Sequence, residues 1–267
     1  MMRGCMRALG VVLILLGTFT ATARDVRMST TTSTDNSGLL RYLMPMFEQK
    51  TGIKVQWIAV GTGKALEIAK SGDVDVVLVH ARAAEDKFVA EGWGVNRRDV
   101  MYNNFVIVGP DADPLHVKGK DALLAFRKIA DAKSTRFISR GDNSGTDQME
   151  KSYWKALGVT PSGAWFVSAG LGMGEVLTMA SEMQAYTLTD RATFSAYKAK
   201  TGLSIVVQGD PRLFNPYGII AVNPAKYASV NHDGAMTLID WITSPEGQHK
   251  IAEFNINGEQ QFFPNAK

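Results

Sequence analysis

The sequence has only one cysteine, Cys5, and this residue lies in an N-terminal stretch that has the pattern of a secretory leader. In residues 1–23, Arg3 and Arg7 precede an apolar core over residues 8–19, and small residues end the stretch as they do at a cleavage site. No cysteine stands at that site to accept a lipid. We therefore expect an exported chain without a lipid anchor, whose mature form has neither a disulfide nor a thiolate-bound metal.

Long apolar runs are scarce as well. The core of the leader is about a dozen residues long, and no later stretch approaches the roughly 20 apolar residues of a membrane helix. An excess of one charge is also missing, because the formal net charge of +3 includes the two leader arginines and no leader acid, which leaves +1 for the mature chain. These absences indicate a soluble product and give no support to a nucleic-acid or membrane-surface partner.

Metal-ligand patterns are the third absence. The four histidines stand far apart, at His80, His116, His232 and His249, and show no metal-binding interval. We therefore expect no metal and no other cofactor. A surface or capping role is the expected one for each of them, and His80, which ends a predicted strand, is the histidine of most interest.

Strands and helices alternate along the roughly 244 residues that follow the leader. Apolar runs bounded by glycine predict strands, and apolar residues at helical spacing predict helices. Strands are expected at 25–29, 53–60, 74–79, 104–108, 136–139, 185–188, 204–208 and 219–222, and helices at 38–50, 64–70, 83–91, 121–130, 147–157, 174–182, 190–200, 236–243 and 245–254. This alternation is typical of an α/β fold in which helices cover a parallel sheet.

A run of hydroxyl side chains follows the first predicted strand, from Ser29 to Gly38. It contains no lysine, arginine or histidine, and it leads into a helix. A helix start that offers hydroxyl and backbone N–H donors can hold an anion, but the same residues also serve as an ordinary helix cap. Thr31, Thr32 and Ser33 are the candidate ligand residues, and the sequence leaves open which of them binds.

A second polar loop adds a cation after the strand predicted at 136–139. Arg140 offers a planar fork of donors that can engage two oxygens of one anion. Ser144, Gly145 and Thr146 stand at the start of the next predicted helix and are candidate ligand residues with Arg140. A capped helix beside a surface arginine is the alternative interpretation.

Three acids accompany these loops, Asp142, Asp147 and Asp190. We expect them to cap helices or to orient Arg140. A carboxylate in the pocket would suit an oxyanion that carries a proton, such as hydrogen phosphate, whereas a fully ionised oxyanion needs donors only. We therefore expect Asp142 and Asp147 to face away from the anion.

Two more strand ends carry polar residues. Thr62 and Gly63 follow the second predicted strand, and Tyr186 and Thr189 lie at the end of a later one. Ligands of open parallel sheets bind beyond the carboxyl ends of the strands, so these four residues can gather on the same side as Arg140. A plain turn at Thr62, a half-buried Tyr186 and a helix cap at Thr189 are the structural alternatives.

Two enzyme motifs do not fit these loops. The segment that ends in Gly63 and Lys64 lacks the first glycine of a phosphate-binding P-loop, because Ile58 stands there. In the segment from Gly141 to Gly145 the serine is fourth, whereas a nucleophile elbow has it third. The sequence therefore gives no support to nucleotide hydrolysis or to a serine hydrolase of that type.

Seven segments of the mature chain carry a resemblance to a known family through their order and spacing. They are 30–40 with the hydroxyl run, 60–66 with Gly61-Thr62-Gly63, 78–82 with His80, 101–110, 139–146 with Arg140, 186–191 and 215–217. Together they resemble the periplasmic tungstate-binding proteins of ABC importers, the TupA-type family. The resemblance covers essentially the whole mature chain.

The resemblance implies an α/β fold with two lobes, like that of the type II periplasmic binding proteins. Two crossover strands would join the lobes and form a hinge. The crossings would lie near 104–110 and 215–222, lobe one would comprise 24–105 and 219–267, and lobe two would comprise 109–215. The hydroxyl run and Thr62 would then face Arg140 across a cleft that closes on the ligand.

The resemblance also implies the ligand, which is tungstate, with molybdate as a second candidate, held as an oxyanion by hydrogen bonds without direct metal coordination. Arg140 is the strongest candidate ligand residue. The implied protein is a monomeric periplasmic receptor, not an enzyme, that delivers the anion to the membrane permease of an ABC importer. Two alternatives stay open: a receptor for phosphate or sulfate, and an exported phosphoester hydrolase that would use Ser144 with Arg140 but lacks a histidine base.

Overall fold

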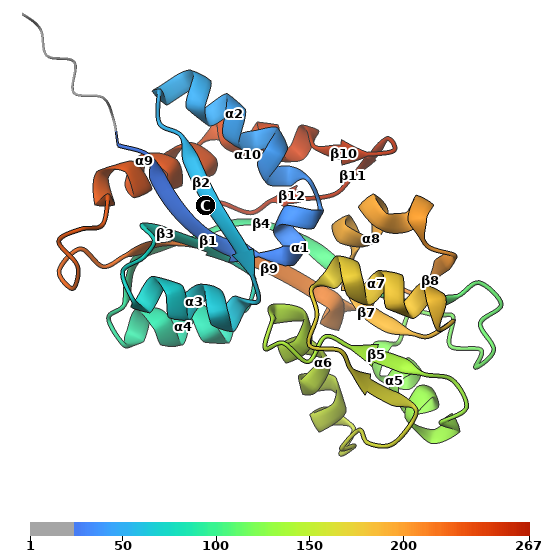
Figure 1. The fold of residues 1–267 in the computed structure, drawn as a ribbon. Helices are drawn as coiled ribbons and strands as arrows, with labels where there is room; N and C mark the ends of the chain where they lie inside the picture. Colours follow the sequence, from blue (N-terminus) through green and yellow to red (C-terminus); the bar gives the residue numbers. More distant parts are fainter. Residues whose placement is uncertain (1–23) are drawn as a thin grey trace, which may run out of the picture.

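The computed structural model describes residues 24–267, so the leader predicted for residues 1–23 lies outside the described part. Figure 1 shows two lobes. One lobe combines the blue N-terminal and the red C-terminal parts of the chain, and the other contains the green-to-orange middle part. Within the described residues, no helix is long and apolar enough to cross a membrane.

The first lobe is built on a sheet in which β1 (Val26–Thr31) lies between β2 (Val55–Val60) and β3 (Val76–Val79), parallel to both. The helices of this lobe are α2 (Leu39–Thr51), α3 (Thr62–Lys70), α4 (Arg82–Ala90), α9 (His232–Thr243) and α10 (Pro245–Glu253). Leu43, Phe47, Ile219 and Trp241 belong to its main hydrophobic core. The burial of these side chains supplies most of the stability of the lobe.

The sheet is mixed, which corrects the parallel sheet expected from the sequence. β9 (Phe214–Val222) runs antiparallel to β3 and to β4 (Gly94–Pro110). The strand direction follows from the return of the chain out of the second lobe. Local alternation of strands and helices does not report that path, so the sequence could not show it.

β4 passes through both lobes. Its first part, up to Asn104, pairs with β9, and its last part, from Phe105, pairs with β7 (Thr187–Asp190) and β8 (Leu203–Val207). The sequence predicted a strand only over residues 104–108, because two irregularities of register interrupt the preceding stretch. The lobe and hinge boundaries given above stay a prediction.

The second lobe has its own small sheet and an aromatic core. β5 (Phe137–Ser139) and β6 (Phe166–Ser168) are parallel. The helices are α5 (Ala122–Ala132), α6 (Gly145–Ala156), α7 (Met173–Glu182) and α8 (Arg191–Tyr197). Phe126 packs against Phe137 and Trp154, with ring centroids 5.3 and 4.4 Å apart. The two lobes therefore do not depend on one common core.

The remaining elements are short. They are α1 (Thr32–Asn36), the 3₁₀ turns Lys198–Lys200 and Pro211–Leu213, and the strands β10 (Asn255–Ile256), β11 (Glu259–Gln260) and β12 (Phe263–Pro264). The sequence predicted none of them as separate elements. Only α1 bears on the candidate site, because it is formed by the hydroxyl run.

Candidate functional site

The hydroxyl run after β1 forms a short helix rather than a loop. Thr31 is the residue before α1, and its Oγ1 accepts a hydrogen bond from the Thr34 amide at 3.2 Å. The same oxygen lies 2.8 Å from the Thr34 hydroxyl. Thr31 therefore caps the helix, which confirms the structural interpretation of the run for this residue.

Two other hydroxyls of the run reach the second lobe. The Oγ1 of Thr32 accepts a hydrogen bond from Arg140 Nη2 at 2.9 Å, and the Oγ of Ser33 accepts one from Arg140 Nη1 at 3.2 Å. Ser29 and Thr30 instead donate to backbone carbonyls of their own lobe. Of the three candidates in the first loop, Thr32 and Ser33 are thus the two that meet Arg140.

Arg140 follows β5 directly, and its side chain is only 1% exposed. Besides the two hydroxyls, it contacts Asp142, whose Oδ2 lies 2.5 Å from Arg140 Nη2. Asp142 Oδ1 accepts a hydrogen bond from the Ser144 amide at 3.1 Å. The expectation that Asp142 orients Arg140 is confirmed, but the expectation that it faces away from the anion-binding groups is wrong, because it lies on the guanidinium.

The other two acids behave as expected. Asp147 Oδ2 accepts hydrogen bonds from the Asn143 amide at 3.0 Å and from Lys151 Nζ at 2.6 Å, and within residues 24–267 this carboxylate makes no hydrogen bond to Arg140. Asp190 caps α8, because its Oδ1 accepts a hydrogen bond from the Thr193 amide at 2.9 Å. Both carboxylates are fully buried.

The turn after β2 also meets the Arg140 loop. Thr62 Oγ1 accepts a hydrogen bond from the Gly145 amide at 3.1 Å, and the Gly63 amide donates to the carbonyl of Asn143 at 3.2 Å. Ser144 is committed to its own helix, since its Oγ accepts a hydrogen bond from the Asp147 amide. The structure thus brings together the starts of α1, α3 and α6, which are three places where backbone N–H groups point outward.

Five buried polar atoms around this contact have no hydrogen-bond partner within residues 24–267. They are Arg140 Nε, Thr146 Oγ1, Asp147 Oδ1, His80 Nε2 and Asp190 Oδ2. A buried polar atom without a partner costs about 1–3 kcal/mol, so native proteins rarely gather several of them without a purpose. Their presence indicates a site that a polar ligand or water completes. Thr146 and Arg140 were predicted as ligand residues, and the other three were not.

His80 and Asp190 are joined by two asparagines at the crossing between the lobes. His80 Nδ1 lies 2.9 Å from Asn215 Oδ1, Asn215 Nδ2 donates to Asn103 Oδ1 at 2.7 Å, and Asn103 Nδ2 donates to Asp190 Oδ1 at 3.4 Å. The His80 ring also stacks on Tyr217. Asn103 and Asn215 face each other in the register of β4 and β9, which the sequence could not reveal.

The protonation states of this chain of residues follow from burial. Burial is the main reason why the pKa of His80 falls to about 4, and the Arg140 charge acts in the same direction. Burial also raises the pKa of Asp190. His80 is therefore a neutral imidazole near pH 7. Because Asn215 uses its amide group to donate to Asn103, His80 Nδ1 carries the proton and Nε2 is an acceptor.

Two predicted ligand residues lie apart from Arg140. Tyr186 is fully buried in the core of the second lobe, where its hydroxyl donates to Asp113 Oδ1 at 2.8 Å and accepts from the Leu115 amide. Its assignment to the anion site is corrected to a structural one, because the hydroxyl is fully engaged. The Thr189 hydroxyl donates to the carbonyl of Asp190 and makes no hydrogen bond to Arg140 in the described part of the chain.

We expect Tyr186→Phe to lower the free energy of unfolding by about 1–3 kcal/mol while leaving anion affinity unchanged. The substitution removes the donor to Asp113 and the acceptor for the Leu115 amide inside the lobe. Urea unfolding and anion titration measure the two quantities. Tyr42→Phe is the control, because the Tyr42 ring packs on Phe254. If Tyr186→Phe had normal stability but bound the anion more weakly, Tyr186 would be a ligand residue after all.

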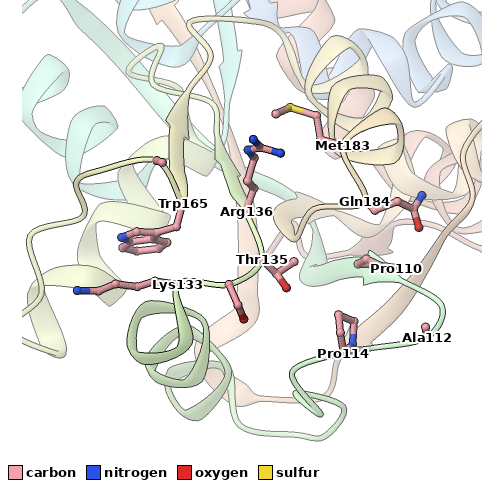
Figure 2. Close-up of a pocket in the computed structure, with 11 residues that line it drawn as sticks. Pro110, Ala112, Pro114, Lys133, Thr135, Arg136, Trp165, Met183 and Gln184 are labelled. Atoms are coloured by element: carbon pink, nitrogen blue, oxygen red, sulfur yellow. The ribbon is translucent and has the colours of Figure 1, made fainter.

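A separate cavity of about 490 Å³ lies in the second lobe. Figure 2 shows Lys133 and Trp165 on one side of it and Pro110, Pro114 and Gln184 on the other. None of the predicted ligand residues lines it. The cavity is thus distinct from the cluster around Arg140.

The chain is similar to proteins of one family over most of its length. Residues 18–246 match the family model described as PBP superfamily domain. A protein of Peptoclostridium acidaminophilum described as tungstate-binding protein TupA is 50% identical over 247 residues, which cover 91% of this chain and 86% of the relative.

Two solved structures are similar in both sequence and fold. One, described as the tungstate ABC transporter from Geobacter sulfurreducens, is 58% identical with a TM-score of 0.80 and covers 86% of this chain and 98% of its own. The other, a tungstate-binding protein TupA from Desulfovibrio alaskensis G20, is 47% identical with a TM-score of 0.77 and covers 92% of this chain and 100% of its own. At these identities the similarity extends to the sequence as well as to the two-lobed fold.

Proposed function

The chain belongs to the TupA-type tungstate-binding proteins of the PBP superfamily, and from that premise we propose that it captures tungstate between its two lobes and delivers it to an ABC importer. The observation that carries the proposal is the buried Arg140 of the second lobe, which donates to the hydroxyls of Thr32 and Ser33 at the start of α1 in the first lobe. An arginine held in this way is suited to a tetrahedral oxyanion.

The proposed ligand set consists mainly of neutral donors around one cation. Thr32, Ser33, Thr62 and Thr146 supply hydroxyls. Gly63, Ser144 and Gly145 supply backbone N–H groups, which exchange their acceptors in the structure, Asn143, Asp142 and Thr62, for the anion. Thr31 and Thr189 contribute indirectly, as a helix cap and as the neighbour of Asp190. Tungstate is fully ionised near pH 7, so it needs donors and no acceptor. The proposal includes molybdate as a second ligand, because the two anions are nearly alike in size and charge.

The relatives are substrate-binding proteins of transporters, and we infer that this chain is likewise a binding protein rather than an enzyme. The alternative of a phosphoester hydrolase needs a base beside Ser144. Ser144 Oγ accepts a hydrogen bond from the Asp147 amide, and the neutral His80 uses its Nδ1 on Asn215. Neither contact prepares the serine to attack a phosphorus centre.

The proposal places the protein in the periplasm as a monomer that docks on a membrane permease. The leader predicted for residues 1–23 supports export, and a receptor that closes as a hinge needs no second copy. Lobe closure changes the surface that the receptor presents to the permease. The permease can therefore distinguish the loaded receptor from the free one.

Calorimetric titration of the protein without residues 1–23 tests the proposal. Tungstate is expected to bind most tightly, molybdate next, and sulfate and phosphate far more weakly. Thermal unfolding with and without each anion is the second readout, because at equal concentration the anion that binds the folded protein most tightly raises the unfolding temperature most. Tight phosphate binding without any heat from tungstate would refute the proposed function.

A further inference from the structure

Asp142 holds the Arg140 guanidinium in the way that an oxyanion would. One carboxylate oxygen lies 2.5 Å from Arg140 Nη2, and the other accepts a hydrogen bond from the Ser144 amide at 3.1 Å. Ser144 is the residue before α6, a helix of 12 residues. A guanidinium and an amide at a helix start are the donors that bind phosphate-like anions in proteins. Asp142 therefore uses part of the donor set proposed for the ligand.

The ion pair lies where the two lobes meet. The side chains of Arg140 and Asp142 are 1% and 16% exposed, respectively. Across the contact stands Gly61, at which an added Cβ would come within 3.2 Å of Asp142 Oδ2 and 3.0 Å of its carbonyl oxygen. The first lobe thus approaches the carboxylate closely, and the Asp142 charge lies at the contact between the lobes.

Asp142 neutralises the charge of Arg140. Within the described residues, Asp142 makes the only salt bridge to Arg140, and the other side chains that accept from its guanidinium are the uncharged Thr32 and Ser33. The pair is therefore already neutral. A dianion added while Asp142 stayed in place would bring two uncompensated negative charges into a buried site, which is strongly unfavourable.

The loop around Asp142 is built so that the carboxylate can leave without disturbing the helix. Gly141 and Asn143, on either side, both have left-handed backbone angles, with φ of 62° and 57°. Asp147 independently holds the Asn143 amide, and the Ser144 hydroxyl independently caps α6. The partial exposure of Asp142 gives its carboxylate a path to water.

We propose that Asp142 is a resident counter-anion that an incoming oxyanion must displace from Arg140, and that this exchange selects doubly charged over singly charged tetrahedral anions. This inference rests on the proposed function. A monoanion that replaces the carboxylate exchanges one negative charge for another and gains little. A dianion gains one further unit of attraction to Arg140 and to the helix starts, so it displaces Asp142.

Perrhenate is the appropriate probe, because it has the shape of tungstate and nearly its size but carries a single negative charge. Calorimetry would measure tungstate and perrhenate binding to the wild type, to Asp142→Asn and to Asp121→Asn. The amide of Asp142→Asn keeps an acceptor for the Ser144 amide but removes the charge. Asp121 is the matched control, because it caps α5 and pairs with Arg212 in the same lobe.

The wild type is expected to bind tungstate and to reject perrhenate. In Asp142→Asn, perrhenate affinity should rise by at least about tenfold, tungstate affinity should not fall, and the melting temperature without anion should drop, because Arg140 loses its partner. Asp121→Asn should keep the wild-type selectivity. If Asp142→Asn does not fold, Asp142→Ser is used in its place, because serine also removes the charge and keeps a side-chain acceptor.

Two results would overturn the inference. Weaker tungstate binding in Asp142→Asn would mean that Asp142 supports Arg140 in the loaded state, and unchanged perrhenate binding would mean that the carboxylate does not select by charge. Failure of the wild type to bind tungstate would instead refute the proposed function. The two failures are therefore distinguishable in the same set of titrations.

Discussion

Arg140→Ala is expected to weaken tungstate binding by about 10²- to 10³-fold, the equivalent of losing one partner of a buried ion pair. The Arg140 side chain is fully buried between the lobes and donates to Thr32, Ser33 and Asp142. Without it, the dianion meets only neutral donors, and Asp142 becomes a second negative charge in the site. Calorimetry with tungstate measures the loss.

Arg140→Lys and Arg136→Ala are the comparisons for this variant. Lysine keeps the charge but not the planar fork, so its affinity should fall between the wild type and Arg140→Ala. Arg136 lies just before β5 and lines the separate cavity of the second lobe, so its removal should leave tungstate binding unchanged. Circular dichroism and thermal unfolding establish that each variant is folded. A folded Arg140→Ala with wild-type affinity would show that the anion binds elsewhere.

The sequence could identify the loops that form the candidate site because their signals are local. A hydroxyl run after a strand, an arginine before a helix start and a Gly-Thr-Gly turn are each visible within about ten residues. In the structure these segments become α1, the Arg140 loop and the start of α3, and they do meet. Local chemistry was sufficient to predict that Arg140 lies close to Thr32 and Ser33.

The parts that the sequence missed depend on contacts between distant segments. Asn103 and Asn215 become partners only through the register of β4 and β9, and Asp190 joins them from a third strand. Tyr186 was misjudged for the same reason, because its partner Asp113 lies 73 positions away in the chain. The antiparallel direction of β9 likewise follows from the path of the chain between the lobes.

Gly145→Ala is the second substitution with a large expected effect, and it acts on lobe closure rather than on charge. A Cβ at this position would lie 2.8 Å from the backbone oxygen of His80 and 3.0 Å from its ring. The backbone at the end of β3 cannot yield easily, so the closed arrangement should lose about 1–3 kcal/mol and tungstate affinity about 5- to 150-fold. The helix itself should not suffer, because alanine favours helix more than glycine does.

Measuring tungstate affinity together with the unfolding temperature distinguishes an effect on lobe closure from an effect on folding. Gly145→Ala should bind tungstate more weakly while its unfolding temperature without anion stays normal or rises, and small-angle scattering should show a more open molecule in the presence of tungstate. Gly202→Ala is the matched control, because no atom lies within 4 Å of its added Cβ and its backbone angle is ordinary. If Gly145→Ala bound tungstate as the wild type does, the close contact between the start of α6 and His80 would not belong to the loaded state, and tungstate would have to be held with the lobes further apart.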